Sequence, residues 1–407
     1  MRCRHCDAFD LQPVIDLGTS PPSNAFPPIG TDPATEPRLP LRAVVCTHCW
    51  LMQTEDVIGR EALFDADYAY YSSYSSSWLA HAERYVNQMV RDLQLGPEDL
   101  VIEVASNDGY LLQYVRARGI GALGIEPTAG TAAAARDRGI DTIERFFGRA
   151  LAEELAGDGR RPRLMVANNV LAHVPDINDF VAGFATLLAP DGVATFEFPH
   201  LLVLLRDGLY DTIYHEHYSY LALGTVQRIF AGHGLRVVDV EELPTHGGSL
   251  RVHAVLSSSP REESHRVGAM VERERQAGLF DVNGYRRLQG LADTTRDWLR
   301  RLLADEHAAG HTVAGYGAAA KGTTLLNHAG VTVDRLQFVV DRNPAKQDRQ
   351  MPGTGVPIHT EGRLGSERPD VILMLPWNLS AELATQLAYV RGWGARFAAP
   401  LPEGRVW

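Results

Sequence analysis

The pattern of apolar and polar positions predicts alternating strands and helices through the middle of the chain. Residues 78–95 form an amphipathic run with helical periodicity, and residues 99–104 have the pattern of a short buried strand. Small residues at 105–109 separate that strand from a second helical run at 110–118. This order of strand, small-residue turn and helix is typical of the first unit of an α/β nucleotide-binding fold.

A second strand at 122–125 ends at Glu126, about twenty residues beyond the first turn. An acidic side chain at that place in an α/β fold can bind both hydroxyls of a ribose. Apolar strands at 163–167 and 192–198 continue the same order and extend the sheet. The middle of the chain is therefore expected to bind a nucleoside.

The last third of the chain predicts a second, smaller α/β domain. Two charged helical stretches at 261–276 and 284–309 lead into a strand, a glycine-rich turn and a helix at 311–322. Lys321 lies at the start of that helix, where the amino terminus favours anions, so a sugar-nucleotide diphosphate is a candidate ligand. The alternative is a structural domain whose glycines only allow close packing.

Length and charge narrow the classes of partner. A chain of 407 residues predicts two or three domains, and a formal net charge of −11 argues against nucleic acid as a partner. No apolar run approaches the roughly 18 residues that a membrane span needs, so no membrane partner is expected. The first residues lack the apolar stretch of a signal peptide, which favours a cytoplasmic protein, expected as a monomer or weak homo-oligomer.

All four cysteines fall in two C-x-x-C pairs near the start of the chain. Cys3 and Cys6 form the first pair, and Cys46 and Cys49 form the second. Four thiolates in this pattern favour a closed tetrahedral zinc site, which stabilises a fold and leaves no position for catalysis. The alternatives are a redox dithiol, which normally needs one pair, and buried free cysteines.

The densest cluster of proton-transfer groups lies at 213–221, where two histidines, a glutamate and three tyrosines occur within nine positions. Histidine changes charge near neutral pH and tyrosine can donate to a developing oxyanion, so this segment could remove a proton from a carbon beside a carbonyl. The alternative is an aromatic strand or helix edge with solvated histidines.

The turn after the first strand distinguishes between cofactors. The G-x-G-x-x-G pattern that lets a backbone approach a pyrophosphate is absent. Glu103 instead ends the strand, and Asp108-Gly109 follows in the turn. This arrangement resembles the first motif of class I S-adenosylmethionine-dependent methyltransferases, whose cofactor carries no phosphate. The resemblance implies an S-adenosylmethionine-binding domain.

Six segments together resemble one family over essentially the whole chain: the two C-x-x-C pairs and residues 103–109, 214–217, 246–251 and 315–321. The family is that of the sugar-nucleotide C-methyltransferases of deoxysugar biosynthesis. Its members methylate C-3′ of dTDP-4-keto-deoxyhexoses, and relatives act at C-5′. The resemblance implies a zinc-binding module at 1–65, a methyltransferase domain at 66–245 and a sugar-nucleotide-binding α/β domain at 246–407.

The resemblance also implies roles for individual residues. His217 matches the family's base, and Tyr214 and Glu216 match its assisting tyrosine and glutamate. His173 corresponds to the histidine after an asparagine-containing strand, and Tyr70 is our choice from the tyrosine-rich loop. Tyr214, Tyr70 or His173 is expected to donate to the oxygen of an enolate, and Glu216 to orient the imidazole of His217.

Two further groups of contacts are expected. The residues expected to bind the cofactor are Glu103, Ala105, Asn107, Asp108, Gly109, Glu126 and Asn168. The residues expected to bind substrate are Tyr68, His215, Arg251 and Lys321. His215 is the second candidate for the base, and Arg251 is alternatively a surface arginine on a plain turn. Ala105 departs from the family, which often has glycine at that position.

Other functions are compatible with parts of the chain. An O- or N-methyltransferase would share the cofactor-binding domain, and a non-catalytic zinc-containing assembly protein would share the fold. A reductase that uses the C-terminal glycine-rich turn would need a nicotinamide cofactor. Binding of S-adenosylmethionine or of NADH distinguishes these possibilities.

Overall fold

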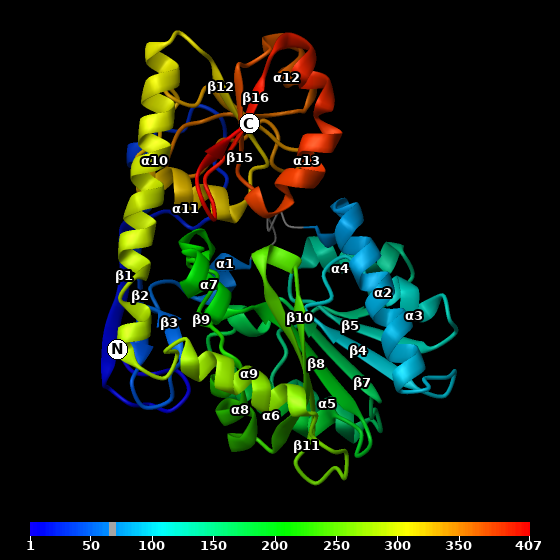
Figure 1. The fold of residues 1–407 in the computed structure, drawn as a ribbon. Helices are drawn as coiled ribbons and strands as arrows, with labels where there is room; N and C mark the ends of the chain where they lie inside the picture. Colours follow the sequence, from blue (N-terminus) through cyan, green and yellow to red (C-terminus); the bar gives the residue numbers. More distant parts are fainter. Residues whose placement is uncertain (65–70) are drawn as a thin grey trace.

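The structure is a computed structural model that describes residues 1–64 and 71–407. Tyr68 and Tyr70 therefore lie outside the described residues. Three sheets divide the molecule into an N-terminal module, a central domain and a C-terminal domain, with the C-terminal domain lying against one edge of the central domain (Figure 1). None of the described helices combines the length and apolar character needed to cross a membrane.

The central sheet has seven strands in the order β6-β5-β4-β7-β8-β11-β10. They are β4 (Leu100–Val104), β5 (Gly121–Ile125), β6 (Asp141–Ile143), β7 (Leu164–Asn168), β8 (Val193–Pro199), β10 (Leu235–Leu243) and β11 (Ser249–Leu256). The strands β4 to β8 run parallel, whereas β11 is antiparallel to both of its neighbours. This sheet confirms the predicted α/β core.

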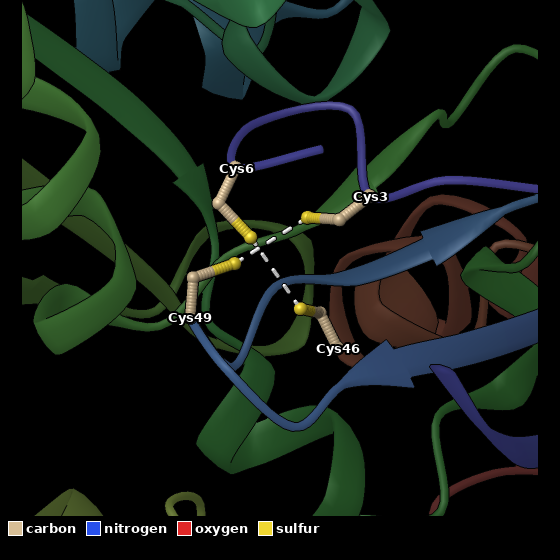
Figure 2. Close-up of side chains that lie close together, drawn as sticks. All are labelled: Cys3, Cys6, Cys46 and Cys49. Carbon is tan, nitrogen blue, oxygen red and sulfur yellow. Dashed lines mark hydrogen bonds between the residues drawn. The ribbon is translucent and has the colours of Figure 1, made fainter. Parts of the chain in front are cut away.

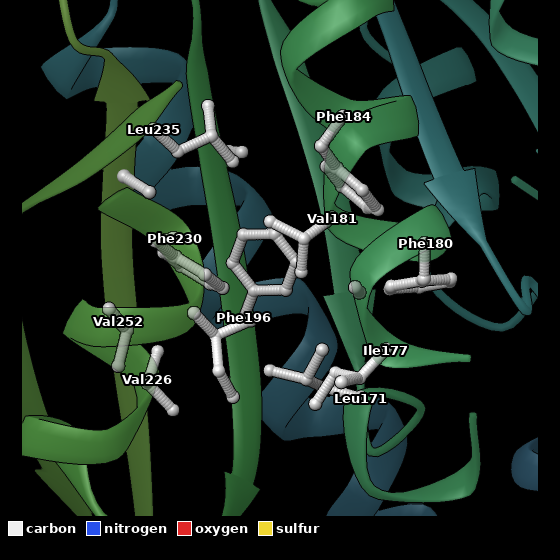
Figure 3. Close-up of a cluster of buried hydrophobic side chains, with 14 of the residues drawn as sticks. Leu171, Ile177, Phe180, Val181, Phe184, Phe196, Val226, Phe230, Leu235 and Val252 are labelled. Carbon is white, nitrogen blue, oxygen red and sulfur yellow. The ribbon is translucent and has the colours of Figure 1, made fainter. Parts of the chain in front are cut away.

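Helices cover both faces of the central sheet. One face packs against α2 (Ser76–Asp92), α3 (Leu112–Arg116) and α4 (Ala129–Asp137), and the other against α5 (Arg149–Gly157), α6 (Ile177–Leu187), α8 (Leu223–Gly232) and α9 (His265–Gln276). Figure 3 shows Phe196 of β8 between Phe184 of α6 and Phe230 of α8, with ring centroids 4.6 and 4.7 Å away. Parallel strands covered on both faces must be apolar on both sides, which explains their continuous hydrophobic pattern.

The central sheet continues beyond the predicted boundary at residue 245. β11 pairs with β8 from Ser249 to Ala254 and with β10 along its whole length. Its carboxyl half is as buried as the parallel strands. The strand that follows residue 245 therefore completes the central sheet.

The C-terminal domain contains a six-stranded sheet in the order β14-β13-β12-β15-β16-β17. Its strands are β12 (Val313–Tyr316), β13 (Phe338–Val340), β14 (Ile358–His359), β15 (Val371–Met374), β16 (Arg396–Ala399) and β17 (Arg405–Val406), and its helices are α11 (Ala320–Ala329), α12 (Gly362–Glu367) and α13 (Ser380–Gln386). The long helix α10 (Leu288–Ala308) runs from the N-terminal module to this domain (Figure 1).

The N-terminal module has a sheet whose last strand comes from the middle of the chain. Its strands are β1 (Leu11–Ser20), β2 (Leu39–Cys46), β3 (Met52–Thr54) and β9 (Ser219–Tyr220). There are two further short helices: α1 (Arg60–Leu63) follows β3 in the chain, and α7 (Leu201–Asp207) follows β8. Because β9 belongs to the cluster at 213–221, the module directly supports the segment expected to be catalytic.

Short 3-10 helices complete the described structure. They are η1 (Pro33–Thr35), η2 (Ser72–Tyr74), η3 (Leu171–His173), η4 (Tyr210–Thr212), η5 (Thr245–Gly247), η6 (Val282–Tyr285), η7 (Trp377–Leu379) and η8 (Ala388–Trp393). Of these, η2, η3, η4, η5 and η7 contribute residues to one large cavity.

Candidate active site

A cavity of about 850 Å³ lies between the central and C-terminal domains. It is lined by the residues that follow β4, β5 and β7 in one domain and β12, β13 and β15 in the other. The carboxyl ends of parallel strands in both sheets thus face the same space, the usual position of ligands in open α/β sheets. The sequence-predicted residues that line the cavity are Ala105, Asn107, Glu126, Asn168, His173, Tyr214, His217 and Lys321.

A turn brings His217 and Tyr214 together. The backbone N–H of His217 donates to the carbonyl of Tyr214 at 2.9 Å, so the segment is a tight turn and not an extended strand. The two rings stack with centroids 4.0 Å apart, and the Tyr214 hydroxyl lies 2.8 Å from His217 Nε2. Thr54 of β3 holds the turn by donating its hydroxyl to the His217 carbonyl at 2.9 Å.

The hydrogen bonds of His217 define its tautomer. Nδ1 lies 2.7 Å from the carbonyl of Thr212, which can only accept, so Nδ1 carries the proton and Nε2 presents a lone pair toward Tyr214. Burial lowers the pKa of His217 well below its usual value, and the neighbouring His173 imidazole adds to that effect, although the Thr212 carbonyl opposes it. His217 is therefore a neutral imidazole at neutral pH.

His173 of η3 is the second imidazole in this part of the cavity. Its ring meets that of His217 edge-on, with centroids 4.5 Å apart, and its other side meets Phe64. Burial lowers the pKa of His173 to about 4, and a hydrogen bond to the Glu216 carbonyl works in the opposite direction. Two neutral imidazoles thus share one apolar corner of the cavity.

The structure places Glu216 and His215 away from the reacting side of His217. Among the described contacts, Glu216 Oε1 accepts from the backbone and side-chain nitrogens of Asn24, each at 3.1 Å, and the imidazole of His217 is oriented by Thr212 instead. His215 lies 3.1 Å from the Pro40 carbonyl in the N-terminal module. A turn points successive side chains in different directions. This explains why neither the Glu216 carboxylate nor the His215 imidazole lines the cavity.

One end of the cavity is formed by the turn after β4. Glu126 Oε2 accepts from the backbone N–H of Asn107 at 2.9 Å, and Glu126 Oε1 accepts from the backbone N–H of Thr128 at 3.0 Å. Ala105 and Asn107 both adopt left-handed conformations, with φ of 56° and 50°. Ala105 therefore adopts a backbone conformation that glycine takes without strain, at a cost of about 1–2 kcal/mol for a left-handed residue with a side chain.

Glu103, Asp108 and Gly109 lie behind the cavity wall. Asp108 Oδ2 pairs with Arg138 at 3.0 Å and accepts from the backbone N–H of Ser73 at 3.3 Å. Gly109 has φ of 76°, and a Cβ there would approach Ile140 to 3.0 Å. Burial raises the pKa of the Glu103 carboxyl well above its usual range. These residues shape the turn and anchor η2 to it, and they reach a ligand only through that turn.

The C-terminal domain contributes the basic side of the cavity. Lys321 in the first turn of α11 donates to the His246 carbonyl at 3.2 Å and lies 4.9 Å from the centre of the Trp377 ring. Lys346 and Arg342 also line the cavity beside Asp341. A helix amino terminus and three basic side chains are suited to an anion.

The four cysteines form a compact cluster (Figure 2). All four sulfurs lie within 4.8 Å of one another, with Cys3 and Cys49 at 3.4 Å and Cys6 and Cys46 at 3.6 Å. Zn–S bonds of about 2.3 Å in a tetrahedron separate sulfurs by about 3.8 Å, so the cluster fits a zinc ion. Hydrogen bonding from Cys49 lowers the pKa of Cys3 to about 5, which favours a thiolate.

Three family descriptions match successive parts of the chain: a zinc binding domain at 3–64, a methyltransferase domain at 78–240 and a C-methyltransferase C-terminal domain at 244–402. A curated relative, the C-methyltransferase NovU of Streptomyces niveus, is 36% identical over 404 residues, which cover 99% of this chain and 96% of the relative. The chain belongs to the C-methyltransferase family. It is an S-adenosylmethionine-dependent C-methyltransferase with a structural zinc site.

Two similar solved structures each cover 44% of the chain. The magnesium protoporphyrin IX methyltransferase of Synechocystis PCC 6803 with bound SAM matches with 16% identity, 79% of its own chain and a TM-score of 0.34. The glycopeptide N-methyltransferase MtfA complexed with SAM matches with 14% identity, 93% of its chain and a TM-score of 0.33. The methyltransferase family domain and the central sheet confirm the class I methyltransferase core that the sequence predicts.

The cavity end at β4 fits S-adenosylmethionine. The cofactor carries a sulfonium and an ammonium group, and the buried acidic side chains of Glu103, Asp108 and Glu126 cluster at this turn. Glu126 lies at the end of β5, where an acidic residue can accept from ribose hydroxyls. Asn168 follows at the end of β7 and lines the same space.

Arg251 does not line the cavity. Its guanidinium is buried in the central domain and donates to Glu197 at 2.7 Å, and it lies 4.4 Å from the centre of the Tyr85 ring. Although burial acts in the opposite direction, hydrogen bonding from His81 and the charge of Arg251 lower the pKa of Glu197 to about 2. The expected substrate contact is therefore a buried ion pair, because Glu197 lies on the neighbouring strand.

The variant Arg251→Met is expected to lose stability and keep its affinity for substrate. Removing one partner of a buried ion pair leaves the other uncompensated and costs about 3–5 kcal/mol. Thermal unfolding measures the loss, and KM measured well below the unfolding temperature should stay at the wild-type value. A raised KM in a variant of unchanged stability would contradict this assignment.

Sequence reasoning missed several aromatic and imidazole groups in the cavity wall. Trp78 stacks on His81 with centroids 4.9 Å apart, and its ring also lies 5.9 Å from Tyr110 and 5.4 Å from His246. Trp78 begins the amphipathic run and Tyr110 directly follows Asp108-Gly109. Both residues could have been proposed from the sequence because each lies next to a motif that was recognised. The approach of His246 to them depends on the tertiary fold.

Proposed function

We propose that this C-methyltransferase acts on a dTDP-4-keto-deoxyhexose and methylates a carbon next to the ketone, at C-3′ or C-5′, through an enolate. The observation that carries this proposal is the neutral His217, whose Nε2 lone pair lies in the cavity beside the Tyr214 hydroxyl. Carbon is a poor nucleophile, so methylation at carbon needs a base to remove an acidic proton first.

The proposed reaction uses residues of the cavity in sequence. His217 Nε2 takes the proton from the carbon beside the ketone, and the C–H electron pair moves into the enolate. Tyr214 holds the imidazole before this step, and Thr212 accepts from Nδ1 throughout, so the resulting imidazolium keeps one fixed partner. S-adenosylmethionine supplies the electrophilic methyl group. The enolate carbon uses its electron pair for the new C–C bond, the carbon–sulfur bond of the methyl donor breaks with its electron pair left on sulfur, and the ketone is restored. His217 then releases its proton to solvent.

A sugar nucleotide is supported by the basic side of the cavity. Burial lowers the pKa values of Lys321 and Lys346. The charge of Asp211 opposes this effect at Lys321, and the charge of Asp341 opposes it at Lys346. Buried ammonium groups at a helix amino terminus favour a multiply charged anion such as a diphosphate. His217 and the basic residues line the same cavity from different domains, so a sugar nucleotide can place its sugar at His217 and its diphosphate at the basic residues.

The test is incubation with S-adenosylmethionine and dTDP-4-keto-deoxyhexoses in deuterated water, followed by mass spectrometry and proton NMR. A new carbon-bound methyl group supports the proposal and identifies the carbon. Methylation on oxygen or nitrogen, with the ring carbons unchanged, would replace it with the alternative of an O- or N-methyltransferase.

The pH profile of kcat/KM should reflect the lowered pKa of His217. The base must be neutral, and an unperturbed histidine becomes protonated near pH 6.5, at about its ordinary pKa. Burial, the nearby imidazoles of His173 and His246 and the positive charge of Lys321 lower the pKa of His217, so activity should persist as the pH falls through that value and decline only at lower pH. Thermal unfolding at each pH separates this decline from acid unfolding. An acid limb above pH 6.5 would contradict the assignment.

A further inference from the structure

His246 supplies an imidazole to the cavity that the proposed reaction does not yet use. It lies in η5, between β10 and β11, at the edge of the central sheet that faces the C-terminal domain. Its ring meets Trp78 edge-on at 5.4 Å, and its carbonyl accepts from Lys321. A residue from the central domain is thus held by the basic wall of the other domain.

The backbone around His246 is forced into its shape. His246 has φ of 55°, a left-handed conformation that costs a residue with a side chain about 1–2 kcal/mol. Gly247 has φ of 94° and a Cβ there would lie 2.6 Å from the Trp377 ring, and Gly248 has φ of 140° and a Cβ there would lie 2.9 Å from Val203. The surrounding packing therefore holds the loop so that the histidine faces the cavity, and such strain is commonly found at functional sites.

The partner of His246 defines which ring nitrogen carries the proton. Asn169 presents its amide nitrogen to His246 Nε2 at 3.2 Å, and with the amide in this orientation Nε2 is the acceptor and Nδ1 carries the proton. No hydrogen bond joins Nδ1 to any residue in the part of the chain that the structure describes. Burial lowers the pKa of His246 to about 4, with the charge of Lys321 adding to the effect, so Nδ1–H belongs to a neutral ring.

Two other groups that could donate to an enolate are already committed. The Tyr214 hydroxyl is hydrogen bonded to the lone pair of His217 Nε2. His173 donates the N–H of one ring nitrogen to the Glu216 carbonyl. Its Nδ1 has no partner among the described residues, so Nδ1 is the acceptor nitrogen of a neutral ring. His246 therefore differs from both by carrying an uncommitted N–H.

We propose that His246 is a catalytic residue that donates its Nδ1–H to the enolate oxygen while His217 takes the carbon-bound proton. The inference rests on the proposed function. When the C–H electron pair moves toward the carbonyl, the oxygen gains negative charge and the hydrogen bond from Nδ1 strengthens, without transfer of that proton. As the new C–C bond forms, the charge leaves the oxygen and the bond weakens again. A neutral imidazole suits this task because it donates without protonating the oxygen, as the neutral histidine of triosephosphate isomerase does.

The variant His246→Gly tests the proposal, because glycine adopts the left-handed backbone without strain and removes only the ring. In the absence of S-adenosylmethionine, the wild-type enzyme should exchange the substrate's acidic carbon-bound hydrogen for deuterium. His246→Gly should slow both this exchange and methyl transfer by about 100- to 1,000-fold, as loss of one oxyanion donor does. The Kd for S-adenosylmethionine should be unchanged, and added imidazole should restore part of the exchange.

The outcome that overturns the inference is wild-type exchange in His246→Gly with slower methyl transfer, since His246 would then act after enolate formation. A weaker Kd for S-adenosylmethionine with normal exchange would also overturn it and make His246 a cofactor contact. Failure of the proposed function itself is distinguishable, because then the wild-type enzyme shows no exchange at carbon with any substrate of this class. Thermal unfolding of His246→Gly confirms that the fold is retained.

Discussion

The variant His217→Asn is expected to lose methyl transfer by about 100- to 10,000-fold, the usual contribution of a general base. Asparagine keeps a nitrogen that can donate to the Thr212 carbonyl, which His217 Nδ1 does at 2.7 Å, so the turn should keep its shape. It offers no group that accepts a proton from carbon. The Tyr214 hydroxyl loses the lone pair that it now faces, but it cannot replace the base because a protonated phenol does not accept a proton from carbon.

Two readouts separate loss of the base from loss of structure. Deuterium exchange at the substrate carbon should disappear with methyl transfer, whereas the Kd for S-adenosylmethionine should remain near the wild-type value, because the cofactor end of the cavity is built from β4, β5 and β7. His215→Asn is the matched control: it changes the neighbouring histidine, which contacts the Pro40 carbonyl outside the cavity. Near-normal turnover in His217→Asn, or loss of exchange in His215→Asn alone, would transfer the role of base to His215.

Local patterns were enough for the zinc site and for the turn after β4. Each C-x-x-C pair presents two sulfurs from one loop, so spacing alone predicts a metal site, and the family and the sulfur cluster confirm it. The turn at 105–109 is likewise a local feature, since one strand and one helix define it. The left-handed Ala105 shows that its shape is retained where glycine is absent.

The partners of single polar residues could not be predicted in this way. Arg251 is separated from Glu197 by more than fifty residues along the chain, and the pairing of β11 with β8 alone makes them neighbours. Glu216 similarly accepts a hydrogen bond from Asn24, which lies 192 residues earlier in the chain. In both cases a charged residue in a conspicuous motif serves packing between distant segments. The assignments of His217, Tyr214 and His173 stay predictions until their variants are measured.

Loss of the zinc site is expected to remove both stability and activity. Cys3→Ser replaces one of four sulfur ligands with a weaker one in a buried cluster. Structural zinc contributes folding free energy directly, so the N-terminal module should unfold at a temperature lower by more than ten degrees, since about 1 kcal/mol corresponds to 2–8 °C in domains of ordinary size. Thermal unfolding and metal analysis of the purified variant measure the two effects.

Activity should be lost with the module because the module holds the catalytic turn. Met52 and Gln53 of β3 pair with Tyr220 and Ser219 of β9, and the Thr54 hydroxyl donates to the His217 carbonyl at 2.9 Å. If these contacts are released, the turn that presents Nε2 loses its support on one side. His48→Ser is the matched control, since His48 is exposed beside Cys49 and lies outside the sulfur cluster. Cys3→Ser enzyme with full turnover at low temperature would mean that the catalytic turn is stable without the metal.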